Sequence, residues 1–169
     1  LPHLRQHISK GKVEFIEGDI RDSEAVRKAL TDVDVVFHEA AQVDIPYSVK
    51  HPFYTHDVNA RGTLNLLIAA MNSNIQRFIS ASSSSVYGDT ASNPISETCP
   101  INPLSPYAAS KVAAEAYCKA FHESYGLPTV CLRYFNVYGP RQNTGVVAIF
   151  LSNQQPLTIY GDGSQTRDF

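Results

Sequence analysis

The sequence predicts an α/β fold in which helices pack against a doubly wound parallel sheet. Segments with strand character alternate with segments of helical spacing along the chain. Residues 33–38 are almost continuously apolar, which is typical of a strand buried on both faces of a parallel sheet. Helix signals are equally clear, with Ser105 and Pro106 before a long helical segment and Gly126 after it. These observations together indicate βαβ units around one sheet.

The elements can be placed in order along the chain. The predicted strands cover residues 13–19, 33–38, 77–80, 129–135 and 157–160. The predicted helices cover residues 24–30, 51–72, 107–125 and 146–151. Asp22 or Ser23 can cap the first of these helices, and Ser105 can cap the third.

Length and composition indicate one globular domain. The chain has 169 residues, with 14 basic and 16 acidic side chains and a net charge of −2, so we expect no nucleic-acid partner. Its 3 cysteines lack Cys-x-x-Cys spacing, which predicts no metal site and favours a reducing, cytoplasmic setting. The sequence has no apolar run of about 18 residues, so we expect no membrane partner.

The chemistry is concentrated in residues 81–111, which begin at the serine run 82–85 and end with Tyr107 and Lys111. Four positions apart on a helix, Tyr107 and Lys111 lie one turn apart on the same face. An ammonium beside a phenol favours the phenolate, which can act as a general base. Such a pair alone is more often an ordinary helix-surface pair, so its interpretation depends on the neighbouring motifs.

A set of motifs accompanies this segment, in a fixed order over nearly the whole chain. They are GDIRD (18–22), HEAA (38–41), VNARGTLNLL (58–67), SSSSVYGD (82–89), SPYAASK (105–111), LRYFNVYGPRQ (132–142) and YGDGSQTRDF (160–169). Together they resemble the extended short-chain dehydrogenase/reductases, specifically nucleotide-sugar epimerases of the UDP-hexose 4-epimerase type. The resemblance implies a partial NAD-binding, Rossmann-like domain over residues 1–143 and the start of a substrate lobe over residues 144–169.

The resemblance also implies catalytic roles for three residues. Tyr107 would be the base, and Lys111 would orient the nicotinamide ribose of NAD and tune Tyr107. Ser83 would hydrogen-bond the substrate oxygen, and Ser84 is the alternative because a run of four serines leaves the register open.

Further residues match positions that contact the cofactor or the sugar nucleotide in the family. Toward NAD the resemblance implies Asp19 and Ile20 at the adenine end, the backbone of Ala40 and Ala41, and Asn59. Toward the sugar nucleotide it implies Asn136 and Arg167, the latter at the diphosphate. His38 is interpreted as a packing residue at a strand end.

The implied reaction is NAD-dependent 4-epimerisation of a UDP sugar, such as UDP-glucose or UDP-N-acetylglucosamine, through a 4-keto intermediate. Family members that dehydrate or decarboxylate typically carry a carboxylate just before Val-Tyr-Gly, where this chain has Ser84 and Ser85. The sequence therefore favours epimerisation over those reactions. A homodimer through a helix bundle of residues 51–72 and 107–125 is the expected assembly.

One part of the family pattern has no counterpart in this sequence. The Gly-x-x-Gly-x-x-Gly turn that binds the pyrophosphate does not occur, nor do the first two strands of the family's fold. We therefore expect a piece of a longer protein that also lacks part of the substrate lobe, or an assembly that fills the gap from another chain. A non-catalytic module that cannot hold NAD is the competing hypothesis.

Overall fold

The protein is built around a small parallel sheet. The computed structural model describes residues 4–90, 94–142, 145–152 and 161–163. Within these residues the sheet has 3 strands in the order β1-β2-β3, namely β1 (Val35–His38), β2 (Arg77–Ser83) and β3 (Thr129–Tyr134). Both strand pairs are parallel, with Phe37 opposite Ile79 in one pair and Ser82 opposite Arg133 in the other. The predicted α/β fold with a parallel sheet is confirmed.

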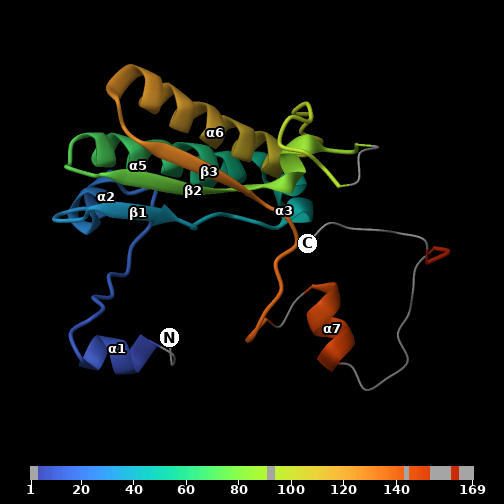
Figure 1. Cartoon of the computed structure of the whole chain (residues 1–169), viewed down its shortest axis with the longest axis horizontal. Helices are drawn as coiled ribbons and strands as arrows, with labels where there is room; N and C mark the ends of the chain where they lie inside the picture. The colour runs from blue at the N-terminus through green and yellow to red at the C-terminus, as the bar shows by residue number, and fades with distance from the viewer. Residues whose placement is uncertain (1–3, 91–93, 143–144, 153–160, 164–169) are drawn as a thin grey trace.

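Helices cover one face of this sheet. The helices are α1 (Arg5–Ser9), α2 (Ser23–Ala29), α3 (Ile45–Lys50), α4 (Pro52–His56), α5 (Gly62–Met71), α6 (Pro106–Tyr125) and α7 (Val146–Ser152). A π-helical turn, η2 (Asp57–Arg61), joins α4 to α5, and a 3-10 turn, η3 (Ser84–Tyr87), follows β2. Helices α5 and α6 lie on the sheet, whereas α1 and α7 lie apart from it on the opposite side (Figure 1).

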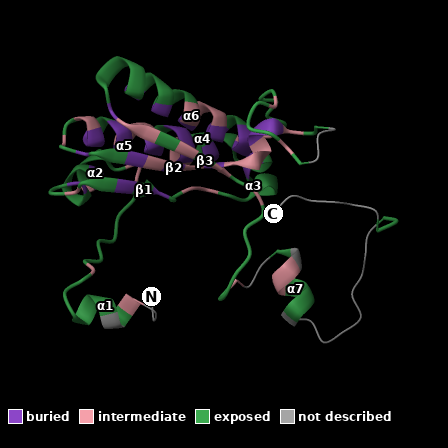
Figure 2. Ribbon diagram, in the orientation of Figure 1, coloured by how far each residue is buried: buried purple, intermediate pink, exposed green. Residues whose placement is uncertain are grey.

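The hydrophobic core lies between the sheet and these two helices, where buried residues gather in Figure 2. Phe78 of β2, Leu67 of α5 and Cys118 of α6 are each 0% exposed. Burying a side chain such as Leu67 stabilises the fold by about 2 kcal/mol. The other sheet face exposes a row of apolar side chains: Val35, Phe37, Val130, Leu132 and Tyr134.

Residues 13–19 form no strand, so that prediction was wrong. The apolar side chains of Phe15 and Ile16 are 57% and 51% exposed. A strand persists only when its backbone groups pair with a neighbour. Within the described residues no strand pairs with this segment, so its backbone has no ladder to join.

The predicted helix 51–72 is interrupted rather than continuous. It divides into α4, the π-helical turn η2 and α5. A π turn adds one residue to the helix and often marks a functional site. Helix α3 was not predicted; it begins after Asp44, whose side chain accepts a bond of 2.8 Å from the backbone N of Tyr47. The predicted strand 157–160 lies outside the described residues.

Helix α6 begins and ends as its sequence predicts. Ser105 is the N-cap, with its Oγ accepting from the backbone N of Ala108 at 3.1 Å, and Pro106 is the first helical residue. At the other end Gly126 adopts the left-handed conformation, with φ of 69°. These two signals fix where the helix starts and ends.

Two glycines with positive φ provide a matched test of local strain. Gly88, just after η3, has φ of 61° and ψ of −145°, and an added Cβ would overlap the backbone oxygen of Asn102. An added Cβ at Gly126 meets no atom within 4 Å.

We therefore expect Gly126→Ala to lower the free energy of unfolding by about 1 kcal/mol, the usual penalty for a left-handed L-residue. Gly88→Ala should lower it by about 3–5 kcal/mol, because strain and backbone overlap add together. Denaturant titration of both variants measures the difference, and equal losses would contradict this account.

Candidate active site

The serine run begins inside β2 and ends in η3. Ser82 is buried against α6, whereas Ser83 is the last strand residue and caps η3. The Oγ of Ser83 accepts from the backbone N of Ser85 at 3.2 Å and donates to the Ser85 hydroxyl at 3.1 Å. Parallel sheets place their ligands at the carboxyl ends of their strands, which is where Ser83 lies.

Tyr107 and Lys111 face the interior from the first turns of α6. They are 8% and 6% exposed, so they are not an ordinary helix-surface pair. Lys111 Nζ donates to the backbone oxygen of Ala81 at 2.8 Å and lies 6.0 Å from the centre of the Tyr107 ring. Burial lowers the pKa of Lys111, while the negative charge of Glu39 acts in the opposite direction.

Several predicted residues meet in one cleft. A cleft of about 390 Å³ is lined by Ser83, Ser84, Tyr107 and Asn136, and by apolar side chains that include Val43. The predicted catalytic phenol, both candidate serines and the predicted sugar-nucleotide residue are thus brought together. Because Ser83 and Ser84 both line the cleft, the choice between them stays open. Arg167 lies outside the described residues.

Asn59 holds the loop after β1 rather than pointing into the cleft. It is 2% exposed, and its Oδ1 accepts from the backbone N of Gln42 at 2.8 Å. Its Nδ2 donates to the Gln42 oxygen and to Ser110 Oγ, each at 2.9 Å. The Asn59 amide therefore ties the turn that carries Ala40 and Ala41 to α6.

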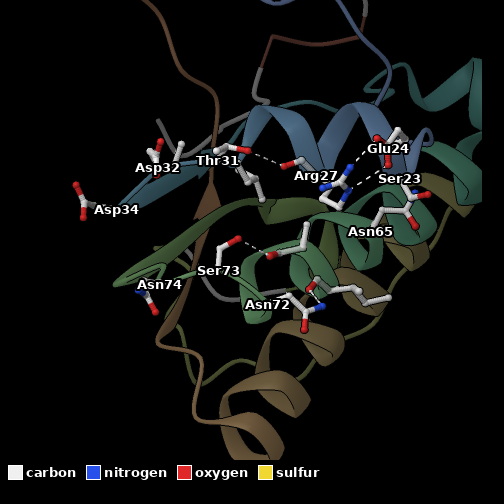
Figure 3. A pocket seen from close by; sticks show the side chains of 14 residues that line it. Ser23, Glu24, Arg27, Thr31, Asp32, Asp34, Asn65, Asn72, Ser73 and Asn74 are labelled. Carbon is white, nitrogen blue, oxygen red and sulfur yellow. Dashed lines mark hydrogen bonds and ion pairs between the residues drawn. The ribbon is translucent and has the colours of Figure 1, made fainter.

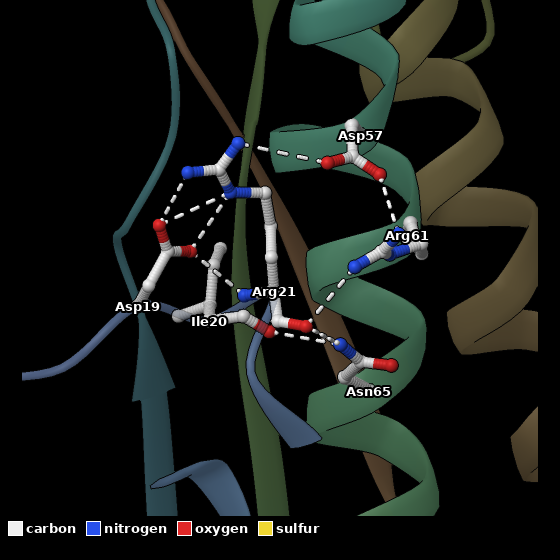
Figure 4. Close-up of polar contacts among 6 residues, drawn as sticks. All are labelled: Asp19, Ile20, Arg21, Asp57, Arg61 and Asn65. Atoms are coloured by element: carbon white, nitrogen blue, oxygen red, sulfur yellow. Dashed lines mark hydrogen bonds and ion pairs between the residues drawn. The ribbon is translucent and has the colours of Figure 1, made fainter. Parts of the chain in front are cut away.

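Asp19 and Ile20 belong to a polar cluster with Arg21, Asp57, Arg61 and Asn65 (Figure 4), and none of these residues lines the cleft. Arg21 donates to both carboxylate oxygens of Asp19, at 2.6 Å from Nη2 and 3.0 Å from Nε. Hydrogen bonds from the side chain and then the backbone of Arg21 lower the pKa of Asp19 to about 2. Asn65 of α5 donates to the backbone oxygens of Ile20 and Arg21, each at 3.0 Å, which fixes this loop on the helix.

His38 is a packing residue, as expected. It is 7% exposed at the end of β1, and its Nε2 lies 2.9 Å from Thr63 Oγ1. The Thr63 hydroxyl already donates to the Asn59 oxygen, so His38 Nε2 is the donor of this bond. Burial, and secondarily the charge of Lys111, lowers the pKa of His38 to about 4, which keeps its ring neutral at pH 7.

Sequence reasoning missed a polar network behind the serine run. Glu115 of α6 accepts from Arg133 of β3 and from Ser82 of β2. A spacing of four residues from Lys111 could have placed Glu115 on the inner face of the helix. Nothing local pairs it with Arg133, which is distant in the sequence.

A larger cleft, of about 870 Å³, lies between α2 and α5 (Figure 3). It is bordered by Asp32 and Asp34 before β1 and by Asn72, Ser73 and Asn74 before β2. This cleft is therefore at the amino ends of the strands. Size alone does not identify the site, because ligands of open parallel sheets bind at the carboxyl ends.

The described part of the chain contains no group of three or more His, Cys, Asp or Glu side chains able to hold a metal ion. None of the helices within the described ranges is both long and apolar enough to cross a membrane.

The parallel sheet with its packed helices defines a Rossmann-like fold. At the carboxyl end of β2 a serine lies in the same part of the fold as a buried Tyr–Lys pair on the next helix. Comparison with known proteins identifies the protein family. The chain belongs to the NAD dependent epimerase/dehydratase family, whose family model matches residues 2–169. The family's dependence on NAD agrees with the cofactor predicted from the sequence.

Relatives include both epimerases and dehydratases. A UDP-glucose 4-epimerase of Mycolicibacterium smegmatis is 41% identical over 176 residues, which cover 99% of this chain and 56% of the relative. The structure of a UDP-N-acetylglucosamine 4-epimerase from Methanobrevibacter ruminantium, in complex with UDP-N-acetylmuramic acid, is 46% identical with a TM-score of 0.85, over 91% of this chain and 52% of that one.

A double mutant of the dTDP-glucose 4,6-dehydratase DesIV from Streptomyces venezuelae, with NAD bound, is 32% identical with a TM-score of 0.86. The match covers 98% of this chain and 53% of that one. The chain thus spans about half the length of the proteins it matches, and its likeness extends to both reaction types.

The Asp19–Arg21 contact makes stability depend on pH in acid. The folded pKa of Asp19, about 2, lies below its ordinary value of 3.8. Its ionised form therefore stabilises the fold above pH 3.8, and this contribution is lost as the pH falls from 3.8 toward 2.

We expect Asp19→Asn to be less stable than the unaltered protein at pH 7 and the gap to narrow below pH 3.8. Denaturant titrations at several pH values measure the gap. In an Arg21→Gln background the stability difference should be smaller, because only the backbone bond from residue 21 to Asp19 remains. A stability difference that stays constant down to pH 2 would contradict the assignment.

Proposed function

We propose that this chain carries the catalytic site of an NAD-dependent epimerase that inverts C4 of a nucleotide sugar through a 4-keto intermediate. The observation that carries the proposal is the composition of the cleft. Ser83, Tyr107 and Asn136 line it, and its described lining includes no Asp or Glu. Oxidation needs a base, which Tyr107 supplies, whereas the elimination of water needs an additional acid or base.

The described residues fit the two ends of NAD. The Lys111 ammonium has three N–H donors. One of them donates a hydrogen bond to the backbone oxygen of Ala81, which leaves two donors for ribose hydroxyls. Asp19 is a carboxylate acceptor suited to an adenine amino group, and we propose Ile20 and the Ala40–Ala41 turn as neighbouring contacts. We assign no residue to the pyrophosphate. NAD, when bound, supplies the hydride acceptor and donor for C4.

Each residue of the cleft has a defined task in this reaction. Tyr107, as phenolate, takes the proton from the sugar 4-hydroxyl and later returns it to the 4-oxygen. Lys111 places its ammonium group 6.0 Å from the centre of the Tyr107 ring. Ser83, or Ser84 in the alternative register, donates to the 4-oxygen while the carbon is a ketone. Asn136 binds the sugar nucleotide near the strand ends.

Dehydration of a nucleotide sugar is the second candidate, favoured by the likeness to the DesIV dehydratase. The position before Val86 argues against it, because Ser84 and Ser85 stand there. Neither hydroxyl is acidic enough to assist the loss of water as a carboxylic acid does. Epimerisation therefore agrees better with the residues present.

We also propose a UDP sugar as substrate and a homodimer as the assembly. The Methanobrevibacter ruminantium epimerase, which is complexed with a UDP sugar, supports the first. An apolar hollow between α4 and α6, lined by Pro52, Phe53, Pro106 and Ala109, supports the second. Phe53 is 90% exposed at its rim, which favours burial against the same helices of another copy.

The assay uses the product of the complete gene with UDP-glucose and with UDP-N-acetylglucosamine. We expect the 4-epimer of at least one sugar to form, with NAD retained by the protein. Tyr107→Phe should lower kcat by about 10²–10⁴-fold, the usual contribution of a general base.

Ser83→Ala and Ser84→Ala are compared in the same assay. The variant with the larger loss of kcat identifies the catalytic hydroxyl. A stable 4-keto-6-deoxy product would favour dehydration instead. Protein without bound nicotinamide and without turnover would favour a non-catalytic module.

A further inference from the structure

An ion pair lies directly behind the serine run. Arg133 donates to Glu115 through two bonds, 2.9 Å from Nε to Oε1 and 2.7 Å from Nη2 to Oε2. Ser82 Oγ donates to the same Oε1. Arg133 and Ser82 are register partners on β3 and β2, and Glu115 reaches them from α6. The pair therefore joins two strands and the helix that carries Tyr107 and Lys111.

The same arginine also holds the far end of η3. Its Nη1 donates to the hydroxyl of Tyr87 at 2.9 Å, and the guanidinium lies 4.9 Å from the centre of the Tyr87 ring. Tyr87 is 2% exposed and is the last residue of η3. Ser83 and Ser84 thus lie between two residues, Ser82 and Tyr87, that are both bonded to one ion pair.

The other connection between α6 and this part of β2 is made by Lys111. Lys111 Nζ bonds the oxygen of Ala81, and one helical turn later Glu115 bonds the side chain of the next residue, Ser82. Two successive turns of α6 are therefore fixed to two successive residues of β2. Removing Lys111 would also remove a catalytic group, so the Glu115 contact is the one that can be tested separately.

We propose that Glu115 and Arg133 are positioning residues that hold the Ser83–Ser84 segment at a fixed place relative to Tyr107 and Lys111. The proposal deepens the proposed function and rests on it for the identity of the catalytic residues. Glu115 and Arg133 do not line the cleft, so they act through Ser82 and Tyr87 and touch neither substrate nor cofactor.

The Glu115–Arg133 pair is largely buried, which makes the loss of either partner costly. The side chains of Glu115 and Arg133 are 13% and 22% exposed, so the loss of one leaves the other poorly solvated and unpaired. Burial opposes ionisation of Glu115, but bonds from Arg133 and Ser82 outweigh it and lower its pKa, so Glu115 is charged at pH 7. A displacement of about 1 Å in a reacting group can lower a rate by about 100-fold.

The test compares graded substitutions in the complete gene product with NAD bound. Glu115→Gln and Arg133→Met remove the charges, whereas Ser82→Ala and Tyr87→Phe each remove a single hydroxyl. We expect the first two to lower kcat by about 10–100-fold with KM and bound NAD unchanged. The hydroxyl variants should lower kcat by smaller factors, and Arg133→Lys should restore part of the loss.

The double variant Ser82→Ala with Glu115→Leu should be no slower than Glu115→Leu alone, because leucine leaves no acceptor for the Ser82 hydroxyl at position 115. Glu24→Gln, in the exposed Glu24–Arg27 pair of α2, is the matched control and should leave kcat unchanged. A lowered melting temperature with kcat unchanged in Glu115→Gln and Arg133→Met would mean a merely structural pair and would overturn the proposal.

Amide hydrogen exchange separates this proposal from the proposed function. Exchange of residues 82–88 should accelerate in Glu115→Gln and Arg133→Met, with β1 unchanged. If the unaltered protein fails to epimerise any sugar, the proposed function is wrong, and exchange alone then decides whether the pair holds the serine segment. Unchanged exchange in both variants would overturn the positioning role in either case.

Discussion

The bond from Lys111 Nζ to the Ala81 carbonyl oxygen, 2.8 Å long, joins the helix that carries the phenol to the strand that carries the serines. An ammonium that is 6% exposed must find strong acceptors, because an unpaired buried charge is expensive. Ala81 lies in the last part of β2, one residue beyond the end of the pairing with β1 at Ser80, while the strand still pairs with β3. This contact fixes the first turns of α6 against the end of β2.

Around that contact, the polar groups behind the cleft support one another. Asn59 holds the loop after β1, Ser110 joins Asn59 to the backbone oxygen of Tyr107, and Glu115 meets Ser82 and Arg133. Each buried side chain of this set has a partner within the described part of the protein. Such a network rigidifies a site, because moving one member leaves another without its bond.

Local signals in the sequence predicted local features well. The spacing of Tyr107 and Lys111 placed both on one helix face, and Ser105 and Gly126 marked the ends of that helix. Long-range partners were beyond such reasoning. The failure at residues 13–19 arose because alternation reports which side chains are apolar, whereas a strand also needs a neighbour to pair with. For the same reason neither the Glu115–Arg133 pair nor the Asn59 amide network could be predicted, since each joins residues far apart in the chain.

The uncovered sheet face has a practical consequence for handling the protein. Phe37 is 68% exposed there, and within the described residues β1 has no neighbour on its outer side. An open strand edge beside an apolar surface is a template on which other chains can add as strands. A preparation that leaves this face bare would self-associate and lose soluble material with rising concentration and temperature. A preparation in which this sheet face is covered would stay dispersed. Light scattering that stays low as concentration rises would therefore report that the face is covered.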